Sequence, residues 1–393
     1  MNHQELSLLC ADRELKTPEH HTANDFYGHA HTLKVYCGLA PEYQIKAAIE
    51  HAPTLGEFVW GPDQSCEFPT ILSFSPARFN QIRERSAKAL FAIGSPILYA
   101  KSALTQEALA HERQRLGRSL LVFPSHSSHF LKIQYDLQDY CEKIKKVAKT
   151  SDCETVRVCL YWKDVLLGAD QLYSAHGFEL VSAGHMFDPL FLPRLRSIIE
   201  SATFATSSEG STAAGYCVAL GLPFFLTDTP YEFEIQKLEH KESTQDELDR
   251  TQVFLQAVAD SLPHEPVERL PTGCKESIDE LWGNRYFRTA PELLAIFEIL
   301  EDALNIAKQV GLPNHNYLFN LIPEYIKAAQ FAKVLLIVQE LERSDAASVG
   351  GLRVAQALAL INLARKNEAR GIISALLAEN PNHEAALELA KMC

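Results

Sequence analysis

The residues best suited to chemistry stand in one short run, Thr206-Ser207-Ser208-Glu209-Gly210-Ser211-Thr212. The run follows the apolar stretch TFA and leads into AAGYCVAL, so it predicts a turn between a strand and a helix. The first backbone N–H groups of a helix are unpaired and carry positive partial charge, which suits a phosphate group. Gly210 lets the backbone approach a ligand closely, and Ser211 or Thr212 can cap the helix. We therefore predict phosphate binding by Ser207, Ser208, Gly210, Ser211 and Thr212, with an ordinary helix cap as the alternative.

Two further turns carry imidazoles and hydroxyls. His126, Ser127 and Ser128 follow the apolar run SLLVF, where the imidazole can shuttle a proton and the serines can surround an anion. His185 follows the run FELVSAG, and we expect it at the same end of the sheet as the serine turn, facing the same nucleotide-binding pocket. A hydrogen-bonded turn and a solvent-facing histidine are the structural alternatives.

A transfer reaction also needs a group that takes a proton from the acceptor. Carboxylates and imidazoles do this, and Asp25, His31 and Glu209 are the candidates of the right type. His29 and His31 could both donate to zinc, but two ligands do not complete a site, so no metal is predicted. The chain contains no GxxxxGK[ST], GxGxxG or HExxH motif, which argues against P-loop, dehydrogenase and metalloprotease chemistry.

The elements that must position these residues follow an α/β rhythm. Between residues 151 and 290, short apolar runs alternate with helix-length amphipathic stretches, which is typical of a parallel sheet covered by helices. Here KDVLLGADQLYSAHG is expected as one helix that ends at Gly177. Residues 31–150 show a similar mixture, with YQIKAAIEH as a helix, TLKVYCGL as a strand or a helix, and SLLVFPSH as the last strand.

The two ends of the chain differ from this α/β body. Residues 1–30 are polar and rich in histidine, and we expect an irregular lead-in. Residues 291–393 keep a helical period and resemble tetratricopeptide units, with fewer repeats than an independent solenoid needs. The sequence therefore predicts two Rossmann-like domains, 31–150 and 151–290, followed by a helical tail that leans on them.

Composition restricts the possible partners. The net charge of −13 argues against nucleic acid as a partner, because nucleic-acid binding needs a cationic surface. The first residues lack the basic and apolar regions of a signal peptide, and no apolar run reaches the about 18 residues of a membrane span. The nine cysteines show no paired spacing. These features predict a cytoplasmic protein.

Residues 154–228 resemble the nucleotide-binding half of GT-B glycosyltransferases and of UDP-N-acetylglucosamine 2-epimerases. The resemblance rests on the turn Ser207–Thr212 and on Leu220-Gly221-Leu222-Pro223 after the helix. Gly184-His185 followed by Ser207-Ser208 is similar to bacterial sialyl- and Kdo-type transferases, although Met186 stands where those have proline. Glu209 resembles the acidic residue that some GT-B enzymes direct at the donor.

The resemblance implies a metal-independent glycosyltransferase of GT-B architecture that needs no cofactor. Residues 31–150 would bind the acceptor, residues 151–290 would bind a nucleotide-sugar donor, and transfer would occur between the two domains. The acceptor would be a glycan, a lipid or a protein, a lipid acceptor would bring peripheral association with a membrane, and the tail would hold a protein partner. The alternatives are a nucleotide-sugar epimerase or hydrolase, and a non-catalytic helical-repeat interaction protein.

Overall fold

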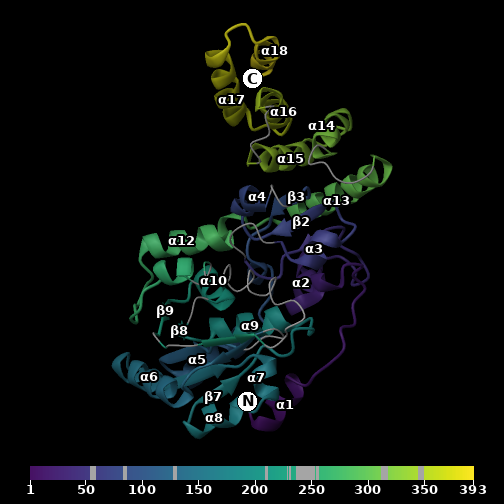
Figure 1. Ribbon diagram of the computed structural model, residues 1–393. Coiled ribbons are helices and arrows are strands. Elements are labelled where there is room, and N and C mark those ends of the chain that lie inside the picture. The colour runs from purple at the N-terminus through teal and green to yellow at the C-terminus, as the bar shows by residue number, and fades with distance from the viewer. Residues whose placement is uncertain are drawn as a thin grey trace.

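The structure is a computed structural model of the 393-residue chain. It describes residues 1–53, 59–82, 86–126, 131–208, 211–227, 229, 232–235, 253, 256–310, 317–343 and 349–393. Two groups of parallel strands and a run of helices succeed one another along the molecule, with the helical region at the top of the view (Figure 1). Among the described helices, none combines the length and the apolar character that a membrane crossing requires.

The bounds of the elements are as follows. The strands are β1 (Ala48–Ile49), β2 (Thr70–Ser73), β3 (Ala89–Ala92), β4 (Ser119–Phe123), β5 (Leu131–Gln134), β6 (Thr155–Cys159), β7 (Glu179–Val181), β8 (Phe204–Ser207), β9 (Phe224–Leu226) and β10 (Glu232–Ile235). The helices of the α/β part are α1 (His3–Leu9), η1 (Thr22–Gly28), α2 (His29–Cys37), α3 (Gly61–Ser65), α4 (Ala77–Ile82), η2 (Pro96–Leu98), α5 (Gln106–Leu116), α6 (Leu137–Thr150), α7 (Trp162–Leu166), α8 (Ala169–Ala175), α9 (Phe191–Glu200), α10 (Thr212–Ala219), α12 (Thr272–Trp282) and η3 (Asn284–Tyr286). The helices that follow are α13 (Ala290–Val310), α14 (Tyr317–Lys327), α15 (Phe331–Arg343), α16 (Val349–Asn362), α17 (Lys366–Glu379) and α18 (Glu384–Met392).

The larger sheet has five parallel strands in the order β7-β6-β4-β8-β9. Successive residues of a strand point to opposite faces, and here both faces are covered. Leu121 and Phe123 of β4 pack with α9, α10 and α12, whereas Leu120 and Val122 pack with α1, α6, α7 and α8. This double burial explains why these strands are continuous apolar runs in the sequence. β5 and β10 form a separate antiparallel pair.

The β-α-β rhythm predicted after residue 151 is confirmed at the level of its elements, with two corrections. The stretch KDVLLGADQLYSAHG is two helices, α7 and α8, because Gly168 adopts a left-handed conformation between them. β4, expected as the last strand of the first domain, lies at the centre of the five-stranded sheet. The expected boundary at residue 150 therefore falls within the chain segment that builds this sheet.

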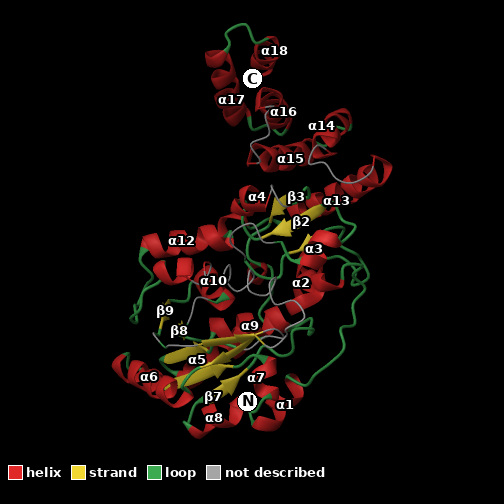
Figure 2. Ribbon diagram, viewed as in Figure 1, coloured by secondary structure: helices red, strands yellow, loops and turns green. Residues whose placement is uncertain are grey.

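The smaller sheet consists of β1, β2 and β3, all parallel and in chain order (Figure 2). Its Leu72 and Phe91 pack with α2 and α13, and its Ile71 and Leu90 pack on the other face with Ile82 of α4. The helix expected over YQIKAAIEH is wrong, since Ala48 and Ile49 pair with β2 there. TLKVYCGL, left open between strand and helix, belongs largely to α2.

The N-terminal residues are more ordered than an irregular lead-in. α1 begins with a capping box at Asn2 and Glu5 and buries Leu6 completely. Further along, η1 leads directly into α2. The expectation of irregular structure over residues 1–30 is therefore wrong for these two segments. Buried apolar residues such as Leu6 are few there, and the surrounding polar residues hide the helical pattern in the sequence.

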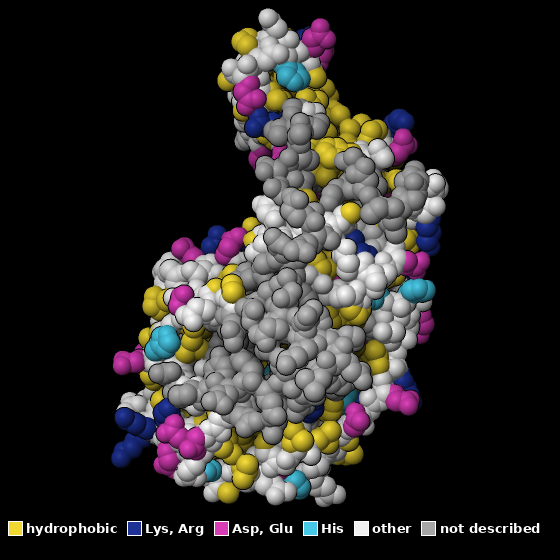
Figure 3. Space-filling view, in the orientation of Figure 1, with side chains coloured by type: hydrophobic (Ala, Val, Ile, Leu, Met, Phe, Trp, Pro, Cys, Tyr) yellow, Lys and Arg dark blue, Asp and Glu magenta, His cyan; other side chains and the backbone are white. Residues whose placement is uncertain are grey.

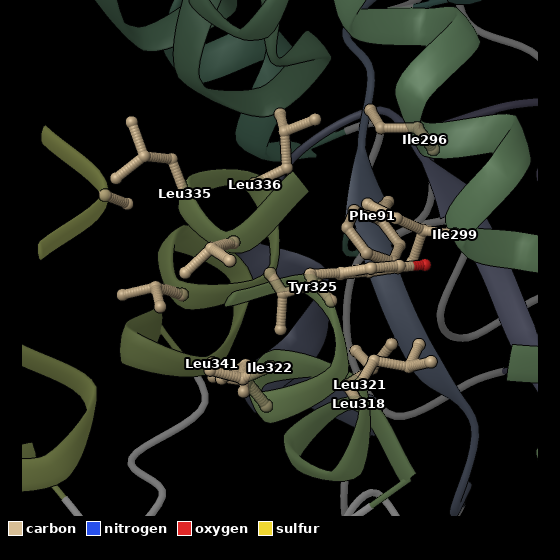
Figure 4. Close-up of a cluster of buried hydrophobic side chains, with 14 of the residues drawn as sticks. Phe91, Ile296, Ile299, Leu318, Leu321, Ile322, Tyr325, Leu335, Leu336 and Leu341 are labelled. Atoms are coloured by element: carbon tan, nitrogen blue, oxygen red, sulfur yellow. The ribbon is translucent and has the colours of Figure 1, made fainter. Parts of the chain in front are cut away.

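The helical tail shares its core with the smaller sheet. Figure 4 shows Phe91 of β3 beside Ile296 and Ile299 of α13, in one cluster with apolar residues of α14 and α15. The same buried cluster continues through α16 and α17 to α18. The expectation that the tail leans on the α/β body is confirmed. Hydrophobic side chains also gather on the surface beside α14 to α16 (Figure 3).

Two turns of the tail repeat one geometry. Ala329 precedes α15 and Ala364 precedes α17, and both adopt a left-handed backbone with φ of 56° and 60°. The residue after each alanine closes an equivalent turn, with Gln330 N–H donating to the Tyr325 carbonyl and Arg365 N–H donating to the Leu360 carbonyl. The tail is thus built from related helix pairs.

The chain returns from the larger sheet to the smaller one after α12. The Trp282 ring lies flat against Gly215 of α10, where an added Cβ would come within 2.1 Å of the ring. Gly283 then packs against the backbone after β2, and a Cβ there would lie 1.8 Å from the Phe74 carbonyl oxygen. On the next residue, the Asn284 side-chain oxygen accepts a hydrogen bond of 2.6 Å from Ser95 after β3.

Candidate functional site

The larger sheet reverses its winding direction at β4. The chain passes from β4 outward to β6 and β7, and then returns to the other side of β4 as β8 and β9. In open α/β sheets, ligands bind outside the carboxyl ends of the strands at such a switch point. The residues that follow β4 and β8 are therefore the first place to look for a site.

Hydroxyl groups meet at this switch point. Ser125 after β4 and Ser208 after β8 bring their Oγ atoms within 2.5 Å of each other. Ser207 is the last residue of β8 and is fully buried, and Thr212 opens α10. These positions agree with the predicted strand-turn-helix arrangement.

Two more hydroxyls at this edge have no hydrogen-bond partner among the described residues. Ser211 occupies the N-cap position of α10, yet its side chain makes no capping hydrogen bond and its buried Oγ stays unpartnered. Thr229, three residues beyond the end of β9, is 4% exposed and its Oγ1 is also unpartnered. Buried polar atoms are nearly always hydrogen-bonded in folded proteins, so these hydroxyls are suited to a polar ligand.

Four of the predicted residues lie outside the described part of the chain. They are Glu209 and Gly210 in the serine turn, and Ser127 and Ser128 after β4.

The two predicted histidines of the larger sheet take different positions. His126 is exposed and stacks on Tyr161 at a centroid distance of 4.2 Å. His185 is fully buried beside the Trp162 ring at 4.0 Å, and its Nδ1 accepts a hydrogen bond from Phe187 N–H at 3.1 Å.

The expectation that His185 faces the same pocket as the serine turn is not supported by this placement. β6 and β4 stand between β7 and β8, which at about 4.8 Å per strand separates the two turns by roughly 14 Å. His185 Nε2 instead lies 3.4 Å from Asp12 Oδ1, out of line for a hydrogen bond.

Asp25, a predicted base, is engaged in local structure. One carboxylate oxygen accepts a hydrogen bond from the Thr17 hydroxyl, and the other accepts the His31 backbone N–H at 3.2 Å. Asp25 thereby caps the first turn of α2, whose N-cap Gly28 has no side chain to do so. His31 is half-buried on α2, and burial lowers its pKa while the nearby Asp25 charge raises it.

A second polar cluster lies at the carboxyl end of the smaller sheet. His29 opens α2 with 1% of its surface exposed, and neither ring nitrogen has a hydrogen-bond partner among the described residues. Glu50 follows β1 and pairs with Arg78 Nε at 2.8 Å, but its Oε2 is unpartnered. His51 is next in the chain, with an unpartnered Nδ1. Glu50 was not identified from the sequence, although Glu50-His51 directly after a short apolar run and before Pro53 is a signal for it.

Burial controls the charge of these groups. Burial, with a smaller contribution from the neighbouring His51, lowers the pKa of His29 to about 3. A backbone contact with Glu50 acts in the opposite direction but falls short of hydrogen-bond geometry. Burial also lowers the pKa of His51 and raises that of Glu50, although Arg78 opposes the latter shift. Asp63 and His21, hydrogen-bonded to each other at 2.7 Å, act on His51 in opposite directions. Both imidazoles at the sheet edge are therefore neutral near pH 7.

Aromatic residues join the edges of the two sheets. Tyr27 donates its backbone N–H to the Met186 carbonyl at 2.6 Å, and its hydroxyl lies 3.4 Å from that of Tyr161. Phe26 packs on Phe187 at a centroid distance of 5.4 Å. Tyr27 holds a left-handed backbone with φ of 56°, a strained conformation that surrounding contacts must maintain. The carboxyl ends of both sheets thus approach each other across these rings.

Because burial lowers the pKa values of His29 and His51, we expect the free energy of unfolding to decrease in acid. The unfolded chain protonates His29 and His51 near their ordinary value of 6.5, whereas the folded chain resists protonation. As the pH falls below 6.5, the free energy of unfolding therefore decreases, by up to about 1.4 kcal/mol per pH unit for His29 until its folded-state pKa of about 3 is reached, and His51 adds a decrease of the same sign. Urea unfolding at neutral pH and near pH 5 measures this slope. His29→Phe should reduce it, while His111→Gln on the exposed face of α5 should not; equal slopes in all three proteins would contradict the assignment.

Among the described residues, no three His, Cys, Asp or Glu side chains converge as ligands of a metal ion. Comparison with known proteins gives no family model and no curated protein that matches the chain.

Proposed function

We propose that the protein is a glycosyltransferase of GT-B type, with a nucleotide-sugar donor held by the larger, Rossmann-like sheet. The observation that carries this proposal is the Ser125–Ser208 pair at the switch point of a five-stranded parallel sheet. Ser211, with its unpartnered hydroxyl at the start of α10, adds a donor beside the positive end of a helix. These groups suit the phosphates of a nucleotide.

The smaller sheet would serve the acceptor. In the transfer, an acceptor hydroxyl oxygen bonds to the anomeric carbon, and the bond from that carbon to the donor phosphate oxygen breaks. The nucleotide leaves with the bonding electrons, and the hydroxyl proton passes to a base. The partly exposed imidazole of His51 beside the smaller sheet suits this role better than Asp25, because both Asp25 oxygens are already engaged. His29 is excluded from this role, because a pKa of about 3 makes its imidazole a weak base near neutral pH. The helical tail would recognise a protein partner, and a lipid acceptor would bring the protein to a membrane surface.

Nucleotide binding is the direct test. A thermal-shift panel of UDP, GDP, CMP and their sugar conjugates should include one ligand that stabilises the protein, by about 2–3 kcal/mol at a hundredfold excess over Kd. Ser208→Ala should lower the affinity for that ligand about tenfold, because the substitution removes a hydroxyl from the switch point. Ser174→Ala, an exposed serine on α8, is the matched control and should bind normally.

Absence of any shift across the panel would contradict the proposal and favour a non-catalytic interaction protein. Free sugar released from the donor without an acceptor would instead favour the epimerase or hydrolase alternative.

A further inference from the structure

A half-buried aromatic surface lies at the carboxyl end of the smaller sheet. His51 and Trp60 pack edge to face at a centroid distance of 5.1 Å, and Phe26 lies 6.0 Å from each of them. Phe187, from the larger sheet, extends the surface at 5.4 Å from Phe26. All four rings keep part of their surface exposed. None of them belongs to the serine turn proposed for the donor.

Polar atoms without a described partner lie directly beside these rings. They belong to His29, Glu50 and the imidazole of His51 itself. His29 and Glu50 are more than nine-tenths buried, at 1% and 7% exposed. Because burial lowers the pKa of both histidines, each neutral ring offers one hydrogen-bond donor and one acceptor. The free oxygen of Glu50 adds another acceptor.

We propose that this aromatic and polar cluster binds a neutral sugar ring, the acceptor end of a glycan. A sugar ring presents a C–H face that packs on aromatic rings, and an edge of hydroxyls that both donate and accept hydrogen bonds. Among the described residues, the cation in contact with the cluster is Arg78, which Glu50 already engages at 2.8 Å. A carboxylated or phosphorylated ring would therefore meet a carboxylate oxygen and neutral imidazoles, which do not favour an anion.

The identification of the bound sugar as an acceptor rests on the proposed function. Sugar binding itself can be tested separately. The labelled full-length protein is applied to a glycan array that carries terminal neutral hexoses, N-acetylhexosamines, uronic acids and sialic acids. We expect binding to a subset of the neutral terminal sugars. Binding confined to the acidic sugars, or to none of the array, would overturn the proposal.

Variants then assign the binding to this surface. Trp60→Leu should weaken binding to the selected glycan about tenfold, because it removes the largest exposed ring of the cluster. Phe287→Leu alters an aromatic side chain that is 39% exposed and far from the cluster in sequence, and it should bind as the parent does. An equal loss in both variants, or in neither, would contradict the assignment.

Tryptophan fluorescence supplies a second readout that is independent of the array. Of the three tryptophans, Trp162 and Trp282 are buried at 4% and 0% exposed, so acrylamide quenching reports mainly on Trp60. The selected glycan should protect Trp60 from quenching, and a nucleotide should not. If the glycan protects Trp60 but no nucleotide shifts the melting temperature, the transferase proposal is contradicted and the sugar-binding proposal is supported. If a nucleotide binds but the glycan does not protect Trp60, the transferase proposal is supported and the sugar-binding proposal is contradicted.

Discussion

Gly283→Ala is expected to destabilise the protein by about 3 kcal/mol or more. Gly283 has a φ of +64°, where any side chain is strained, and its Cβ would lie 1.8 Å from the Phe74 carbonyl oxygen. The obstructing oxygen and the next two atoms, the Phe74 carbonyl carbon at 2.6 Å and Ser75 Cα at 3.0 Å, all belong to the backbone, so no flexible side chain can move aside. The substitution would push the return segment away from the turn after β2. Urea unfolding gives the free energy of unfolding.

The control for this prediction is Gly168→Ala. Gly168 also has a positive φ, of +82°, but no heavy atom of the described residues lies within 4 Å of its Cβ position. It should lose only about 1 kcal/mol, the intrinsic cost of a left-handed conformation. If the two variants lost the same amount, the close approach at Gly283 would not be the cause.

Lys34→Met is expected to cost about 3–5 kcal/mol, because it leaves a buried carboxylate without its counter-charge. Lys34 Nζ lies 2.7 Å from Glu19 Oε1, and the two residues are each 3% exposed. Nζ also donates to the carbonyl oxygens of Pro41 and Tyr43. The pair holds the segment before η1 against α2, and thereby fixes the approach of Phe26 and Tyr27 to the larger sheet. Thermal and urea unfolding measure the loss.

Two companion variants separate charge burial from lost contacts. Adding Glu19→Gln to Lys34→Met removes the buried charge, so the double variant should be more stable than Lys34→Met alone. Lys327→Met breaks the exposed pair with Glu324 and should change stability by no more than about 0.5 kcal/mol. A double variant as unstable as the single one would show that lost hydrogen bonds, and not the charge, dominate.

The larger sheet could be predicted from the sequence because its strands are buried on both faces. Runs such as FATS and FFL are short, apolar and separated by amphipathic helices, so each element is visible in its own segment. The membership of β4 could not be predicted in this way. Pairing of β4 with β6 and β8 is a non-local choice, and nothing within SLLVF distinguishes a last strand from a central one.

The smaller sheet was harder to predict from the sequence, because its strands are very short. β1 consists of Ala48 and Ile49, within a stretch whose alanines, lysine and glutamate all favour a helix. Pairing with β2 and burial against α2 override that propensity. The serine turn was identifiable because hydroxyl residues between a strand and a helix form a local pattern. The cluster of His29, Glu50 and Trp60 was not, since its members come from three separate segments.

The shared core of the smaller sheet and the tail has a consequence for biosynthesis. β1, β2 and β3 leave the ribosome early, yet α13 to α18, which complete their apolar cluster, are made last. The larger sheet, whose core is formed largely by residues between 97 and 282, is synthesised in the interval. The apolar face that carries Leu72 and Phe91 therefore cannot be covered by its full set of native partners until the second core has been synthesised.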